Sequence, residues 1–182
     1  HLKCGLANLN LKKKLPFSGI GSRRTPIEIC TILTKIGDKL QNKGYLLRSG
    51  AAKGADLAFE KNVKSENKCI YTVKNFDYSE ENYSFCYNEL ISVWDKSLNF
   101  DNYDNYCKIL LLRDINQVLG SKETSLEKSK FLICWTPHEN YSKIDVGGSR
   151  IAIRCALNHG IKVHNLVNPA TLNLVKTWLN MV

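Results

Sequence analysis

Short apolar runs alternate with amphipathic segments along most of this chain. The runs end in glycine or a polar turn, as buried strands do, and the segments between them repeat apolar residues every three or four positions, as helices do. Strands are predicted before the glycine turns at residues 19–24 and 50–54 and over residues 68–73, 130–135 and 161–166, and helices over residues 27–43, 104–119, 151–159 and 169–181. This alternation favours an α/β fold with a mostly parallel sheet.

The segment 27–43 shows the helical pattern clearly. Ile29, Leu33 and Ile36 share one helical face, and Gly44 is a typical residue to end the helix. A strand and a glycine turn precede this helix, and a second strand and glycine turn follow it. Because the crossover between parallel strands is right-handed, we expect both turns at the carboxyl edge of the sheet, where open α/β sheets bind ligands.

The first of these turns combines glycines, a hydroxyl group and two arginines. Gly19 and Gly21 have no side chain that would keep an anion away from the backbone N–H groups. Ser22 adds a hydroxyl donor, and Arg23 and Arg24 add positive charge. The composition predicts a phosphate-binding turn. A plain tight turn is the alternative, because glycine-rich matches are common.

Two further glycine turns precede predicted helices. Their candidate ligand-binding residues are Ser49, Gly50, Lys53 and Gly54 in the second turn and Gly147, Gly148, Ser149 and Arg150 in the third. Arg154 lies one helical turn beyond Arg150, so both guanidinium groups are expected on one side of the helix as phosphate ligands, with solvated surface charges as the alternative. Arg48 is also expected at this edge. Trp135 and Thr136 end a predicted strand and are candidates to contact the ligand, with a core position as the alternative for Trp135.

Length and composition set outer bounds. With 182 residues, 43% of them hydrophobic, the chain is long enough for one domain and too short for two ordinary ones. We expect a single domain over residues 15–182, preceded by an N-terminal extension of residues 1–14. No stretch approaches the roughly 20 apolar residues that cross a bilayer, so no membrane partner is expected.

Charge and cysteine content narrow the chemistry. The formal net charge of +9 favours anionic ligands, whether nucleotide, nucleic acid or phosphorylated metabolite. The seven cysteines are scattered without CxxC spacing, which is typical of reduced thiols and predicts a cytoplasmic location. The four histidines show no metal-ligand spacing, so neither a metal site nor a cofactor is expected.

Residues 75–106 break the regular pattern, because they are rich in Asn, Asp, Ser and Glu with interleaved aromatic residues. We expect an insertion or lid here. Its aromatic residues either hold a surface excursion against the body of the domain, which is the favoured interpretation, or form a platform on which bases stack.

Several of these segments, in this order, resemble the SLOG superfamily of Rossmann-like proteins. The nearest branch is the phage and bacterial proteins similar to the DNA-processing protein DprA. The likeness covers residues 15–168 and is carried by residues 18–26, 48–60, 112–120, 134–137 and 147–154. It implies a Rossmann-like three-layer domain. The superfamily includes single-strand DNA binders, nucleotide-signal sensors and the LOG (lysine-decarboxylase-like) enzymes, which cleave the base from a nucleoside monophosphate.

The LOG enzymes carry a catalytic carboxylate after the third glycine turn, where this chain has Arg154. An arginine cannot act as general acid or nucleophile near neutral pH. Asp56 and Glu60, one helical turn apart, are the candidate catalytic residues instead, because glycosidic cleavage needs a carboxylate beside the reacting carbon. Their alternative roles are structural, with Asp56 near a helix N-terminus and Glu60 paired with Lys64.

Three functions follow from these observations. The first is binding of a nucleotide or other phosphorylated small molecule, as a sensor or sequestering protein. The alternative is a nucleoside 5′-monophosphate N-glycosidase, so whether the chain is an enzyme stays open. The second alternative is single-stranded DNA binding as in DprA, although a compact cation cluster suits one or two phosphates better than a backbone track. A homo-oligomer is also open, because folds of this class often pair through helices.

Overall fold

The computed structural model describes residues 13–94, 100–121, 127–141 and 148–181. Their strands form one parallel sheet in the order β3-β2-β1-β4-β5. The strands are β1 (Leu15–Gly21), β2 (Tyr45–Ser49), β3 (Lys68–Ile70), β4 (Phe131–Trp135) and β5 (Lys162–Asn165). The predicted α/β class and its parallel sheet are therefore confirmed.

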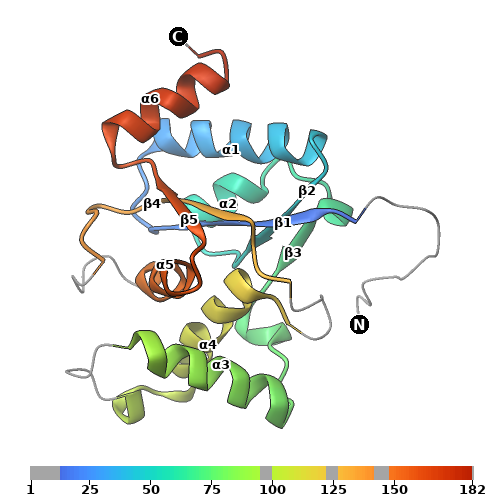
Figure 1. Cartoon of the computed structure of the whole chain (residues 1–182), viewed down its shortest axis with the longest axis vertical. Coiled ribbons are helices and arrows are strands. Elements are labelled where there is room, and N and C mark those ends of the chain that lie inside the picture. Colours follow the sequence, from blue (N-terminus) through green and yellow to red (C-terminus); the bar gives the residue numbers. More distant parts are fainter. Residues whose placement is uncertain (1–12, 95–99, 122–126, 142–147, 182) are drawn as a thin grey trace.

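Helices cover both faces of the sheet and complete a Rossmann-like three-layer arrangement (Figure 1). One face carries α1 (Ile27–Asn42), α2 (Ala55–Glu60) and α6 (Pro169–Trp178), and the other carries α3 (Glu80–Val93), α4 (Asn105–Leu119) and α5 (Ser149–Asn158). Within the described residues, no helix has both the length and the apolar character that crossing a membrane requires.

The sheet separates two apolar cores. Phe17 of β1 and Ile133 of β4 face α1, where they pack with Leu33. Ile20 lies on the opposite side of β1, because strand side chains alternate, and it packs with Leu112 of α4. β1 therefore contributes to both cores and has a hydrogen-bonded strand on each side.

The helix α3 was not predicted from the sequence. Its N-terminus is capped by Ser79, whose side chain accepts a hydrogen bond from the backbone N–H of Asn82. The buried face of α3 begins with Asn82 and continues with Cys86 and Leu90. The Asn82 side chain accepts a hydrogen bond of 3.1 Å from Nδ2 of Asn116 on α4. A polar pair thus stands where the helical pattern requires an apolar residue.

The aromatic residues between α3 and α4 pack on one another. The ring centroid of Phe100 lies 5.6 Å from that of Tyr87 and 5.8 Å from that of Trp94. Phe100 is buried, and Trp94 also makes an edge contact with Tyr103. Phe100 also belongs to the core that contains Ile20 of β1, and Trp94 packs against that core, which supports the interpretation that the aromatic residues of this stretch hold it to the body of the domain.

Candidate functional site

The chain reverses its direction of travel across the sheet between β1 and β4. From β1 the sheet extends to β2 and β3, whereas from β4 it extends to β5. The segment after β1 leads to α1 on one face, and the segment after β4 leads to α5 on the other. Open α/β sheets bind ligands at such switch points, beside the carboxyl ends of the strands.

Asp56 joins the first two glycine turns at this edge. Its Oδ1 accepts a hydrogen bond of 3.1 Å from the N–H of Gly21, and its Oδ2 accepts one of 3.1 Å from the N–H of Gly50. Burial raises the pKa of the Asp56 carboxyl to about 7, although the nearby Arg113 guanidinium acts in the opposite direction. Since both oxygens already hold backbone N–H groups, Asp56 has a structural role in fixing the turns.

The N–H groups of the first turn have acceptors inside the protein. Ser22 donates its N–H to the backbone oxygen of Trp135 at 2.9 Å, and Thr25 donates its N–H to the backbone oxygen of Ser22 at 3.3 Å. The hydroxyl oxygen of Ser22 accepts the N–H of Arg24 at 3.1 Å. These N–H groups therefore hold the turn together in this structure, and donation by the Ser22 hydroxyl to a phosphate stays a prediction.

The two glycines of β1 sit where the backbone is closely packed. A Cβ at Gly19 would lie 2.7 Å from a side-chain atom of Leu47 and 2.8 Å from one of Phe59. A Cβ at Gly21 would lie 2.6 Å from the backbone oxygen of Trp135. Close approach of β2, β4 and α2 thus accounts for both glycines without a ligand, and phosphate binding by them stays a prediction.

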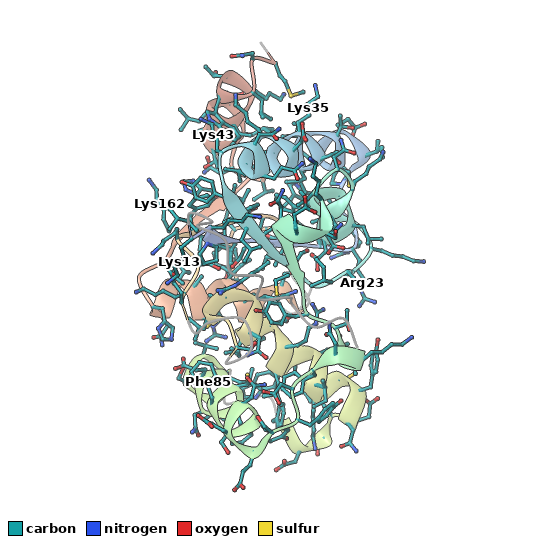
Figure 2. The ribbon with its side chains drawn as sticks, turned by 90° about the vertical axis from the view of Figure 1, so that its right-hand side faces the viewer. Lys13, Arg23, Lys35, Lys43, Phe85 and Lys162 are labelled. Atoms are coloured by element: carbon teal, nitrogen blue, oxygen red, sulfur yellow. The ribbon has the colours of Figure 1, made fainter. Side chains whose placement is uncertain are left out.

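The second turn lies against the first. Gly54 has a φ of +82°, and a Cβ there would lie 2.4 Å from the backbone oxygen of Ser22. Three exposed cations surround this contact on the two turns; they are Arg23, Arg24 and Lys53. Figure 2 shows Arg23 at the surface. The predicted convergence of the two turns is therefore present, and it concentrates positive charge at the edge of the sheet.

Glu60 supports the second turn from the end of α2. Its Oε1 accepts a hydrogen bond of 2.9 Å from the N–H of Ala51, a non-glycine residue with a φ of +56°. The Glu60 backbone oxygen accepts a hydrogen bond of 3.0 Å from the ammonium group of Lys68. Within the described part of the chain, Glu60 forms no ion pair with Lys64. As with Asp56, the geometry assigns Glu60 a structural role, and its catalytic role stays a prediction.

A group of polar side chains from the last turns of α4, hereafter the α4 polar cluster, lies beneath the second turn. It consists of Arg113, Asp114 and Gln117, all buried. A Cβ at Gly50 would lie 1.5 Å from Nη1 of Arg113 and 2.2 Å from Nε2 of Gln117. Arg113 donates to the backbone oxygen of Tyr71 at 3.4 Å. Gly50 is thus required for these side chains to reach the turn.

Several polar atoms at this place lack a hydrogen-bond partner within the described part of the chain; they include Ser49 Oγ, Arg113 Nε and Gln117 Nε2. Asp114 Oδ1 lies 3.6 Å from Arg113 Nε, in an ion pair between neighbours. Burial raises the pKa of Asp114 to about 7, against the opposing effect of Arg113. The α4 polar cluster thus combines buried polar atoms that lack partners with a carboxyl group, Asp114, whose pKa is raised. Both features are typical of side chains that face a ligand.

Asp114 lies in the motif of residues 112–120 and is not among the site residues predicted from the sequence. A signal was present in the pattern. Polar residues at positions 113, 114, 116 and 117 alternate with apolar residues, so this part of the helix has no separate polar face that could be exposed to solvent. Those polar residues are indeed buried, which points to internal partners or a ligand.

The third glycine turn reaches β1 through its serine. Gly147 lies outside the described residues, and Gly148 directly precedes α5. The Ser149 hydroxyl donates a hydrogen bond of 2.7 Å to the backbone oxygen of Gly21. A Cβ at Gly148 would lie 3.5 Å from Oδ2 of Asp114. The N-terminus of α5 therefore stands at the switch point, beside the α4 polar cluster.

Arg150, the second residue of α5, is only 7% exposed. It makes no hydrogen bond or ion pair with any residue that the structure describes. Arg154 follows one turn later and is half-buried. Arg150 is thus a buried guanidinium at a helix N-terminus that has no acidic partner within the described ranges.

Three other predicted residues have roles within the protein. The hydroxyl of Thr136 donates to the backbone oxygen of His138 at 2.7 Å, and its N–H donates to Oδ1 of Asn165 at 3.3 Å. Trp135 is half-buried against the core beside α1, which agrees with its alternative interpretation. Arg48 is 1% exposed and donates to the backbone oxygen of Glu127 at 2.7 Å. The expectation that Arg48 presents its charge at the edge is therefore wrong.

The fold, but not the sequence, is similar to that of a known protein. No family model and no curated protein matches the sequence. The structure is similar to a solved structure of DNA processing protein A from Helicobacter pylori, which was reported for its single-stranded DNA binding mode. The TM-score is 0.54 at 16% sequence identity, and the likeness covers 91% of this chain and 80% of that chain. The expected likeness to DprA is thus confirmed for the fold, while likeness to the LOG enzymes stays a prediction.

Proposed function

We propose that this chain binds single-stranded DNA at the carboxyl edge of its sheet. The observation that carries this proposal is Arg150, a nearly buried guanidinium at the N-terminus of α5 without a partner among the described residues. An unpaired buried charge is costly, and a phosphate oxygen at this position would offset the cost with charge-assisted hydrogen bonds. The dipole of α5 also favours an anion near its N-terminus.

Two further observations support DNA over a single small phosphate. The exposed cations Arg23, Arg24 and Lys53 stand on two turns and Arg150 on a third, so they suit successive phosphates. A protein of similar fold was reported for its single-stranded DNA binding mode. The track is nevertheless short. In Figure 2, Lys13 and Lys162 lie on the side of the molecule opposite Arg23 and add nothing to it.

The proposal is tested by fluorescence anisotropy of a labelled oligothymidylate at several salt concentrations. With about three to four phosphates contacted, log K should fall against log salt with a slope of about −2 to −3. Arg150→Gln should weaken binding about tenfold, the typical effect of one charge-assisted hydrogen bond, and should flatten the slope by about one. Lys35→Gln is the matched control, since it removes one exposed charge on α1 (Figure 2).

Either of two results would contradict the proposal. One is the absence of measurable binding to the oligothymidylate at low salt. The other is an equal loss of affinity for the Arg150→Gln and Lys35→Gln proteins, because this would show that binding depends on total charge and not on the edge of the sheet.

A second candidate is cleavage of a nucleoside 5′-monophosphate, and Asp114 favours it. Its buried carboxyl, with a pKa of about 7, lies beside the N-terminus of α5 and can exchange a proton near neutral pH. Incubation with nucleoside monophosphates, followed by chromatography, should then show free base for the unchanged protein and none for Asp114→Asn. Intact nucleotide together with a thermal shift would support a nucleotide-binding protein instead.

A further inference from the structure

We propose that Glu89, Cys155 and His159 form a binding site for Zn²⁺ between α3 and α5. The ligand atoms of these three side chains all lie within 4.8 Å of one another. This group is distinct from the glycine turns and from the α4 polar cluster. No metal site is expected from the sequence, because histidine spacing and CxxC spacing do not reveal a Cys155 and His159 pair four residues apart on one helix. Glu89 comes from a helix that the pattern did not reveal.

The helix α5 places two of the three side chains on one side. Cys155 and His159 are four residues apart, and the N–H of His159 donates to the backbone oxygen of Cys155 at 3.1 Å. The helical turn therefore continues through His159, so the thiol and the imidazole lie one above the other. This spacing is the one that lets a single helix supply two ligands to a metal ion.

The helix α3 supplies the third side chain from the facing surface. Oε2 of Glu89 lies 2.7 Å from Nε2 of His159. α3 packs on α5 through the core that both helices share, which includes Cys86, Leu90 and Cys155. The carboxylate thus approaches the imidazole across the interface between the helices, and the thiol of Cys155 lies at the base of the pair.

The three donors match the chemistry of zinc. Thiolate, imidazole and carboxylate are the ligands that Zn²⁺ takes in proteins, at bond lengths of about 2.0–2.3 Å. Ligand atoms of a tetrahedral site are then roughly 3.3–3.8 Å apart. Here the Glu89 and His159 atoms are 2.7 Å apart and no pair exceeds 4.8 Å, so the observed separations bracket that range. Thiolate and carboxylate together neutralise the charge of the ion, and His159 binds as neutral imidazole.

A surface hollow borders His159, one of the three proposed ligands. A cavity of about 210 Å³ adjoins the site and is lined by Phe85, Leu119, Lys128 and His159. The side chains of Glu89 and His159 are 23% and 30% exposed, whereas Cys155 is fully buried. Phe85, which is labelled in Figure 2, belongs to α3, the helix that also carries Glu89. Because Glu89 and His159 are partly exposed, a water molecule can enter as the fourth ligand. Cys155 then supplies the one thiolate of the proposed site.

The proposal is tested by titrating the full chain, freed of metal with a chelator, with Zn²⁺ in a calorimeter and with Co²⁺ in a spectrophotometer. We expect one ion per chain and a Co²⁺ spectrum with charge transfer from one thiolate. Glu89→Gln and His159→Ala should each weaken Zn²⁺ binding at least tenfold. Cys155→Ala should abolish the thiolate band, and Cys134→Ala, which alters another fully buried cysteine, should retain it.

Circular dichroism identifies any variant that does not fold. Should Cys155→Ala unfold, Glu89→Gln and His159→Ala still decide the matter, because both positions are partly exposed. The proposal is overturned if the unchanged chain binds no Zn²⁺ in saturable fashion. It is also overturned if these two variants bind the ion as tightly as the unchanged chain, or if Cys134→Ala loses the thiolate band.

Discussion

Two buried carboxyl groups at the carboxyl edge differ in what they contact. Asp56 holds the N–H groups of Gly21 and Gly50, whereas the ion pair of Asp114 is with the adjacent Arg113 at 3.6 Å. Burial raises the pKa of both carboxyl groups to about 7. Hydrogen bonds from two N–H groups support the ionised form of Asp56, and among the described residues no N–H group does this for Asp114. Asp114 is therefore the clearer candidate for a carboxyl that keeps its proton.

A pH dependence of stability follows for Asp114. The folded chain keeps the proton up to a pKa of about 7, while the unfolded chain releases it near the ordinary value of 3.8. The folded state thus binds more protons between these values, so the free energy of unfolding should fall as pH rises from about 4 to about 7. Asp114→Asn should reduce this slope in urea unfolding measured across that range.

The matched control is Asp38→Asn, which alters an exposed aspartate on α1 and should leave the slope unchanged. The same slope in the Asp114→Asn protein and in the unchanged chain would show that Asp114 is ionised in the folded state. In that case it would be a poor candidate for proton transfer near neutral pH.

At the scale of elements, contact between the first two turns depends on one glycine. Gly54 and Gly44 both have a positive φ, +82° and +84°. A Cβ at Gly54 would meet the backbone oxygen of Ser22 at 2.4 Å, whereas nothing lies within 4 Å of a Cβ at Gly44. Gly44→Ala should therefore cost only the backbone strain, about 1–2 kcal/mol. Gly54→Ala should cost about 1–3 kcal/mol more, because its ψ of −122° adds backbone strain for any residue but glycine and because the two turns must also separate.

Urea unfolding of the two variants measures this difference directly. Equal losses of stability would mean that the second turn moves away from Ser22 at no cost. The contact between the turns would then be too soft to position the exposed cations for a ligand.

The sequence predicted most elements correctly because their patterns are local. The apolar runs that became β4 and β5 and the periodic segments that became α1 and α4 needed no tertiary information. β3 ends at Ile70, earlier than predicted, because Thr72 and Asn75 form a capping box that turns the chain. α3 escaped notice because Asn82 is buried through a partner on α4 that is distant in sequence.

The site was predictable in position and not in detail. Glycine turns mark the carboxyl edge because every βα connection of a parallel sheet ends there. That Asp56 holds the N–H groups of Gly21 and Gly50 depends on how α2 packs, which no local pattern contains. The burial of Asp114 and Arg150 depends in the same way on the approach of α4 to α5.

At the scale of the whole molecule, the two cores lie on opposite faces of one sheet. Leu33 belongs to the core beside α1 and Leu112 to the core beside α4, and neither is exposed. If residues 15–182 form a single domain, Leu33→Ala and Leu112→Ala should each lower the free energy of unfolding by about 2–5 kcal/mol in one cooperative transition.

Circular dichroism and tryptophan fluorescence should then give coincident urea unfolding curves for both variants. A Leu112→Ala protein whose α4 side unfolds first, while the α1 side persists, would contradict the prediction of a single domain.

The central position of β1 has a consequence for synthesis on the ribosome. β1 pairs with β4 through contacts such as Ser18 with Leu132, and its other partner is β2. β1 and β2, which lie within residues 15–49, can emerge and pair early. The other edge of β1 stays unpaired until the residues of β4 have been translated. During that interval the nascent chain presents an unpaired apolar strand, a feature that favours misassociation. A chaperone that shields this edge during translation would therefore raise the yield of folded protein.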